Sequence, residues 1–129
     1  MKRMAISAAV VSTTIVLASV GVAAHHSDAG RYEETLTTVT GTVVEFQLVN
    51  PHSMVILDVT GPDGKVARWR GEAGSATQLK RFGLARDSIT FGDTLTITGR
   101  RARNGSPFMT LSEGARIVDA SGKELFHGN

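Results

Sequence analysis

Cysteine is absent from this chain of 129 residues. Its absence excludes disulfide bonds, thiolate metal ligands, catalysis by a thiol and a lipid-modified amino-terminal cysteine. Small exported domains often depend on disulfide bonds. If this chain is exported, its fold therefore has to be stabilised by packing alone.

Aromatic residues and catalytic signatures are also scarce. One tryptophan, one tyrosine and five phenylalanines leave few rings for stacking on the bases of a nucleic acid. The segment 71–75 lacks the Gly-x-Ser-x-Gly order of a nucleophile elbow, and no phosphate-binding loop or dinucleotide fingerprint occurs. We therefore expect a protein that is not an enzyme and does not bind nucleic acid.

A run without charged residues extends from Met4 to Ala24, directly after Lys2 and Arg3. A basic start, an apolar stretch and a small-residue end are typical of a cleaved export signal. We expect a signal peptide over residues 1–24 and a periplasmic or secreted bacterial protein with no membrane association after cleavage. The alternative is a retained anchor, because the run is about as long as a short spanning helix.

Cleavage also changes the charge balance. Removal of Lys2 and Arg3 from the 14 basic residues leaves 12, which equals the number of acidic residues. The mature chain is then close to neutral. The basic isoelectric point of the whole chain is therefore no sign of affinity for nucleic acid.

The residues after position 36 have the alternating pattern of β-strands. We predict strands over residues 38–49, 54–60, 66–70 and 94–100, and a last strand or strand pair within 108–118. Between the third and fourth strands, Ser75 can cap a short helix that ends before Gly83. Gly41 lies inside the long first strand and indicates a bulge or a sharp bend.

Three strands, a short helix and two strands form the element order of an OB-fold. We predict an all-β fold with one short helix, an OB-fold-like five-stranded barrel over residues 36–120. A flexible segment over residues 25–35 precedes it, and a tail over residues 121–129 follows. A β-sandwich needs more strands than this pattern contains. Trp69, the sole tryptophan, is expected in the core.

Two adjacent histidines follow the expected signal directly. Cleavage after Ala24 would give His25 a free α-amine, and an amine beside an imidazole is a compact ligand set for copper or nickel. Cleavage after Ala23 would instead place His26 third in the mature chain, a position that favours square-planar binding of Cu(II) or Ni(II). The alternative is that these exposed histidines have no role.

His52 is the best candidate for a further imidazole ligand, because Pro51 stiffens the loop that carries it. The alternative is that His52 only stabilises the turn. Glu72 either pairs with Arg68 or Arg70, or lies near His52 as an additional metal group. The leading hypothesis is a protein that binds copper or nickel through His25, His26, His52 and Glu72.

Two other functions stay open. In one, the domain is a non-enzymatic module that recognises an envelope protein, peptide or glycan on a strand face near Arg68, Arg70 and Arg100. In the other, a mature amino-terminal histidine serves a copper-dependent oxidative enzyme.

The motifs occur in the order of a known family. They are His25-His26-Ser27, Thr40-Gly41-Thr42-Val43, Asn50-Pro51-His52, Trp69 with Glu72, and Gly92-Asp93. The chain resembles a family of small exported bacterial proteins of unknown function, with His-His-Ser after the signal and a later Asn-Pro-His. The resemblance implies a periplasmic OB-like barrel and no established activity.

Overall fold

The structure is a computed structural model that describes residues 30–129. The expected signal peptide, His25 and His26 lie outside the described residues. The elements in chain order are β1 (Tyr32–Gln47), β2 (Met54–Thr60), β3 (Val66–Glu72), α1 (Ala76–Arg81), β4 (Thr94–Ala102), β5 (Phe108–Thr110), β6 (Arg116–Asp119) and β7 (Glu124–His127). Within this part of the chain, no helix has the length and apolar character needed to cross a membrane.

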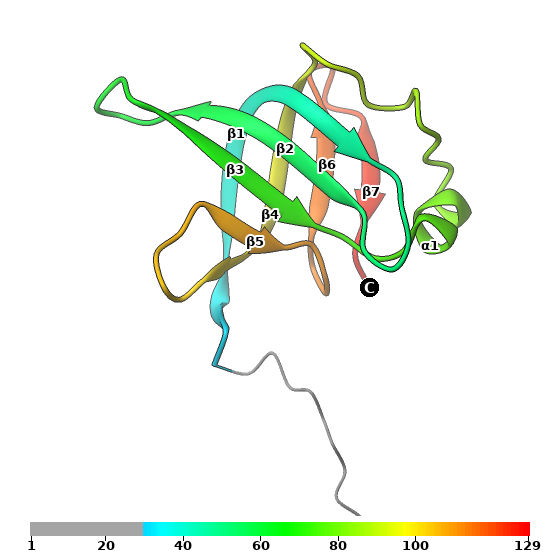
Figure 1. Ribbon diagram of the computed structural model, residues 1–129, viewed down its shortest axis with the longest axis horizontal. Coiled ribbons are helices and arrows are strands. Elements are labelled where there is room, and N and C mark those ends of the chain that lie inside the picture. The colour runs from blue at the N-terminus through cyan, green and yellow to red at the C-terminus, as the bar shows by residue number, and fades with distance from the viewer. Residues whose placement is uncertain (1–29) are drawn as a thin grey trace, which may run out of the picture.

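Five of the strands form a closed ring (Figure 1). β1 pairs antiparallel with β2, and β2 pairs antiparallel with β3. β3 lies parallel to β5, β5 is antiparallel to β4, and β4 returns to β1. The prediction of a mostly β protein with one short helix is confirmed. The predicted count of five strands is too low: β6 corresponds to the second strand of the pair allowed within residues 108–118, β7 was not predicted, and both extend the sheet beyond β4.

β1 takes part in two sides of the ring. Thr42 is its turning point, because this residue pairs with Thr94 on β4 and with Asp58 on β2. A Cβ atom at Gly41 would lie 2.6 Å from the carbonyl oxygen of Asp58. A register shift follows between Val43 and Glu45. The glycine therefore allows close backbone approach next to the bulge, as its position in the strand predicts.

The core lies inside the ring and continues under α1. Leu95 and Ile97 alternate with exposed or half-buried threonines on β4, and both are fully buried. Trp69 is also buried, as expected. The hydroxyl of Ser75 accepts a hydrogen bond from the backbone N–H of Gln78 at 3.2 Å, which confirms the predicted helix cap.

The expected flexible segment and tail are corrected by the structure. Residues 32–35 belong to β1, and residues 124–127 form β7. Phe126 pairs with Ile117 on β6 and is buried in the core. Its ring also meets Phe82, just after α1, in an edge-to-face contact at 5.2 Å. Burial of this aromatic side chain stabilises the short strand β7 against the sheet. The sequence pattern of β7 alone does not indicate this contact.

Candidate functional site

The loop between β1 and β2 is tied to the segment that precedes α1. The carbonyl oxygen of Val49 accepts hydrogen bonds from the Ala76 backbone N–H at 2.9 Å and from the Ser53 hydroxyl at 3.1 Å. Ser53 donates its N–H to Gly74 and accepts from the N–H of Ala73, both at 2.9 Å. These bonds place the Asn-Pro-His motif, with its cis Asn50–Pro51 peptide, against the end of β3.

His52 and Glu72 meet at this junction. The Nδ1 atom of His52 lies 3.6 Å from the Oε1 atom of Glu72. The side chain of His52 is 62% exposed, whereas that of Glu72 is 32% exposed. Their separation exceeds an ordinary hydrogen-bond distance, so the imidazole nitrogen and the carboxylate oxygen are not hydrogen-bonded to each other.

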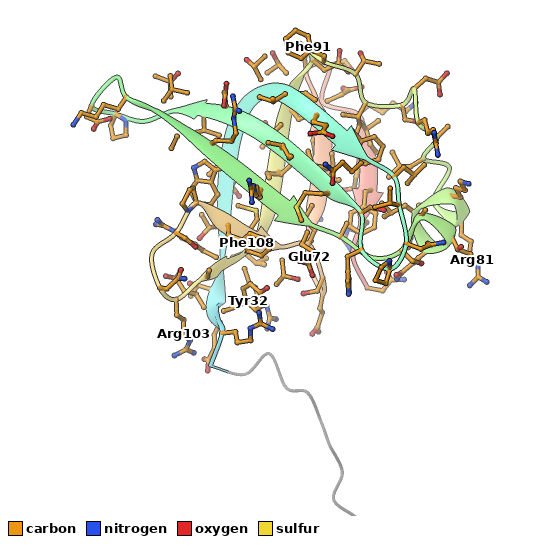
Figure 2. The ribbon with its side chains drawn as sticks, in the orientation of Figure 1. Tyr32, Glu72, Arg81, Phe91, Arg103 and Phe108 are labelled. Atoms are coloured by element: carbon orange, nitrogen blue, oxygen red, sulfur yellow. The ribbon has the colours of Figure 1, made fainter. Side chains whose placement is uncertain are left out.

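The pair lies at a cavity of about 290 Å³. The cavity lining includes polar residues, Gln78, Thr110 and Ser112, and apolar side chains that include Phe82 and Phe126. Glu72 comes from the end of β3, near the middle of the molecule in Figure 2. The arrangement joins one imidazole and one carboxylate to a partly apolar hollow.

The predicted alternative, an ion pair of Glu72 with Arg68 or Arg70, is wrong, because the partner of Glu72 among residues 30–129 is His52. Arg68 instead donates to both carboxylate oxygens of Asp58, at 2.9 and 3.1 Å. This hydrogen bonding holds the pKa of Asp58 below its usual range and raises the pKa of Arg68. The register places Asp58 directly opposite Arg68 on β2. Glu72 is opposite Met54, which leaves it beside the His52 loop.

Residues 30–129 contain no group of three or more His, Cys, Asp or Glu side chains arranged to hold a metal ion. Of the four expected metal ligands, the structure brings His52 and Glu72 together. His25 and His26 are not among the described residues. Any third His, Cys, Asp or Glu ligand beside this pair would therefore come from outside the described part of the chain.

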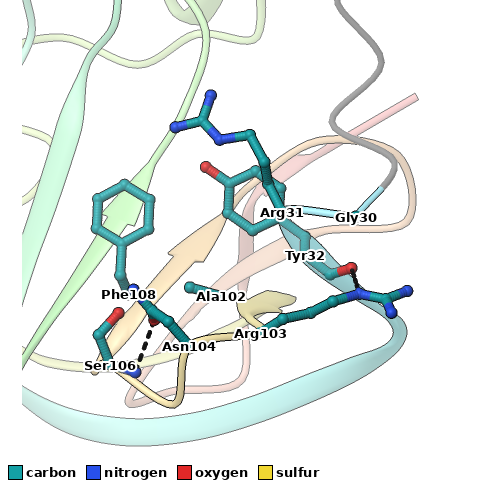
Figure 3. Close-up of a pocket in the computed structure, with 8 residues that line it drawn as sticks. All are labelled: Gly30, Arg31, Tyr32, Ala102, Arg103, Asn104, Ser106 and Phe108. Atoms are coloured by element: carbon teal, nitrogen blue, oxygen red, sulfur yellow. Dashed lines mark hydrogen bonds between the residues drawn. The ribbon is translucent and has the colours of Figure 1, made fainter.

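A second hollow surface was not anticipated from the sequence. Tyr32 at the start of β1 lies near Phe108 of β5, and their rings stack at 6.4 Å with an interplanar angle of 24°. Both rings line a cavity of about 450 Å³, together with the loop between β4 and β5. Figure 3 shows these lining residues. In the sequence, Asn104-Gly105 is typical of a hairpin turn and marks the loop between β4 and β5. It gives no sign of the aromatic side chains that line the cavity beside this loop.

The fold and site define a small β protein with a closed ring of five strands and a His–Glu pair at its edge. The model of a family of unknown function, DUF6152, matches residues 11–110, and the chain belongs to this family. This agrees with the expectation of an uncharacterised family. Neither the curated proteins nor the solved structures contain a significant match.

Proposed function

We propose that this protein is an exported copper-binding protein and that His52 and Glu72 form part of its metal site. The observation that carries this proposal is the 3.6 Å approach of an imidazole nitrogen to a carboxylate oxygen at the edge of a cavity. Imidazole is a good ligand for Cu(II) and Ni(II), and a neighbouring carboxylate can bind the metal or orient its ligands. No catalytic step is part of this proposal.

The amino-terminal histidines would supply the remaining donors. Tyr32 lies beside Phe108, and Phe108 is the register partner of Arg70, two residues before Glu72. Strand spacings of about 5 Å and a rise of about 7 Å over two residues place Tyr32 within roughly 20 Å of Glu72. The structure describes the chain from Gly30, and the four or five residues that separate His26 or His25 from Gly30 span about 13–17 Å when extended. The proposal therefore requires this segment to run toward the pair, and His25 has the longer reach.

We also infer that the ring is an OB-fold-like barrel. The support is its pairing order, β1-β2-β3-β5-β4 and back to β1, with α1 between β3 and β4. This five-stranded arrangement matches the architecture of that fold. In such a barrel the His–Glu pair would lie at the end of β3, where the chain leaves the ring for the helix.

The test begins with the full chain expressed in a bacterium and recovered from its periplasm. An intact mass that starts at Ala24 or His25 would establish the amino terminus. Copper titration and electron paramagnetic resonance would then measure affinity and the number of nitrogen ligands. We expect His52→Ala to weaken Cu(II) binding by about tenfold or more and to remove one nitrogen from the spectrum.

His127 provides a matched control, because it also lies 3.6 Å from a glutamate, Glu124, and is half exposed. His127→Ala should leave both affinity and spectrum unchanged. Equal affinities and spectra for wild type and His52→Ala would overturn the proposed site. Equal losses in the His52 and His127 variants would show unspecific binding to surface histidines.

A further inference from the structure

Two neighbouring cavities share Phe108 in their lining. One cavity of about 450 Å³ includes Arg31, Tyr32 and Arg103, and another of about 330 Å³ includes Arg68 and Arg70. Both cavities are lined by Ser106 and Phe108, so they meet at the start of β5. We name this surface the arginine–aromatic groove: Arg31, Tyr32, Arg68, Arg70, Arg103 and Phe108.

The groove is positively charged. Four of its six defining residues are arginines, and no acidic side chain from residues 30–129 lines either cavity. Asp58 neutralises Arg68 from β2. Glu34 approaches Arg103 at 4.0 Å, but the glutamate side chain is 92% exposed and contributes little. Arg70 and Arg103 therefore leave positive charge in the groove that suits an anionic ligand.

Arg70 is the centre of this excess charge. Its register partners are Ile56 on β2 and Phe108 on β5, and neither carries a charge. Within residues 30–129, the Arg70 side chain makes no hydrogen bond or ion pair. Its guanidinium is therefore available to form a two-pronged pair with a carboxylate.

The aromatic part of the groove is held in place by its surroundings. The Nε–H of Arg103 donates to the carbonyl oxygen of Tyr32 at 2.7 Å (Figure 3). Arg101 donates to the carbonyls of Gly105 and Ser106, and its guanidinium lies 5.2 Å from the ring centroid of Trp69. The loop and the Tyr32 backbone are thus fixed before a ligand arrives, which reduces the entropy lost on binding.

We propose that the arginine–aromatic groove binds an acidic polysaccharide built from uronic acids. A sugar carboxylate would pair with Arg70, and the apolar face of a sugar ring would pack on Phe108, which Tyr32 supports by stacking. Flat aromatic faces beside charged groups favour sugar rings over an extended acidic peptide. The surface also lies on β3 and the loop between β4 and β5, where OB-folds bind oligosaccharides. This inference does not depend on metal binding.

The experiment measures binding of the full mature chain to an oligouronate of defined length by calorimetry. A neutral glucan of the same length, poly-glutamate and single-stranded DNA serve as comparison ligands. We expect oligouronate to bind most tightly, and Arg70→Gln to weaken it about tenfold through loss of a charged hydrogen-bonded pair. Phe108→Leu should weaken the binding of oligouronate and any residual binding of the glucan.

Arg81→Gln is the matched control, because Arg81 carries the same charge on α1, far from Phe108 and Tyr32 in Figure 2. Its affinity for oligouronate should change by less than about twofold. Equal losses for Arg70→Gln and Arg81→Gln, or no binding to oligouronate, would overturn the proposal. Tighter binding of poly-glutamate or DNA would also overturn it. His52→Ala should bind oligouronate normally, which separates this result from the copper test.

Discussion

The backbone N–H of Ser53 donates to the carbonyl oxygen of Gly74 at 2.9 Å, and this bond joins two loops that are far apart in the sequence. Ser53 itself is fully buried. The contact holds the preceding residue, His52, beside Glu72 at the end of β3. The geometry of the candidate metal site is therefore set by backbone bonds behind it rather than by the exposed imidazole.

The buried hydroxyl of Ser53 should contribute to stability. Ser53→Ala removes its hydrogen bond to Val49, whose carbonyl oxygen keeps the bond from Ala76. We expect a loss of about 1 kcal/mol in the free energy of unfolding, measured by urea denaturation. Ser53→Val, which adds apolar volume in a packed site, should lose more. An unchanged urea midpoint for both variants would contradict this account of the loop.

Leu79 should be a main contributor to the packing of α1. Its side chain is fully buried in the core cluster, whereas the next residue, Lys80, is exposed. Leu79→Ala should lower the free energy of unfolding by about 3 kcal/mol through lost burial and a new cavity. Lys80→Ala should stay within about 0.5 kcal/mol of wild type. Similar urea midpoints for the two variants would show that the packing of Leu79 does not stabilise the core.

Two strand glycines should differ in their tolerance of a methyl group. At Gly71 a Cβ would lie 3.0 Å from a Leu111 methyl and 3.2 Å from an Ile97 methyl, both of which can shift. Gly71→Ala should therefore cost about 1–3 kcal/mol. At Gly41 the Cβ would lie 2.6 Å from the backbone oxygen of Asp58, which cannot move without disturbing the pairing of β1 and β2. Gly41→Ala should be the less stable variant in thermal melts, and the reverse order would contradict the register.

The turn between β6 and β7 should contribute pH-dependent stability through Asp119. Its carboxylate accepts from the Ser121 hydroxyl at 2.6 Å and from the backbone N–H groups of Lys123 and Ser121. These bonds hold the pKa of Asp119 below its ordinary value of 3.8. Because the folded state favours the ionised form, the stabilisation is complete above the ordinary pKa and is lost as the pH falls through the lowered one.

Asp119→Asn should consequently lower the melting temperature near neutral pH, and the difference from wild type should shrink as the pH falls below the ordinary carboxyl pKa of 3.8. Melting curves at a series of pH values measure this directly. A difference that stays constant from neutral to acid pH would show that ionisation of Asp119 is not involved. Ser121→Ala should reproduce part of the loss seen for Asp119→Asn, because the Ser121 hydroxyl makes the shortest of the three bonds.

Local sequence patterns predicted several features well because each depends on neighbours within a few residues. The Ser75 hydroxyl accepts a hydrogen bond from the backbone N–H of Gln78, only three residues further along the chain. The alternation that buries Leu95 and Ile97 follows from the two-residue period of a strand. Patterns that span only a few residues did not predict β7. Its four residues form a strand because Phe126 packs in a core that is assembled from distant segments.

The sequence by itself determined the strand periodicity, the short helix and its cap, the glycine next to the bulge, and which residue types could bind metal. The tertiary structure alone decided that Glu72 faces His52 instead of Arg68, and that Arg70 lies between two uncharged neighbours. The reason is physical: side-chain alternation is a local property of the backbone, whereas strand register depends on packing between segments many residues apart. Registers that place Asp58 opposite Arg68 and Phe108 beside Arg70 therefore emerge only when the ring closes.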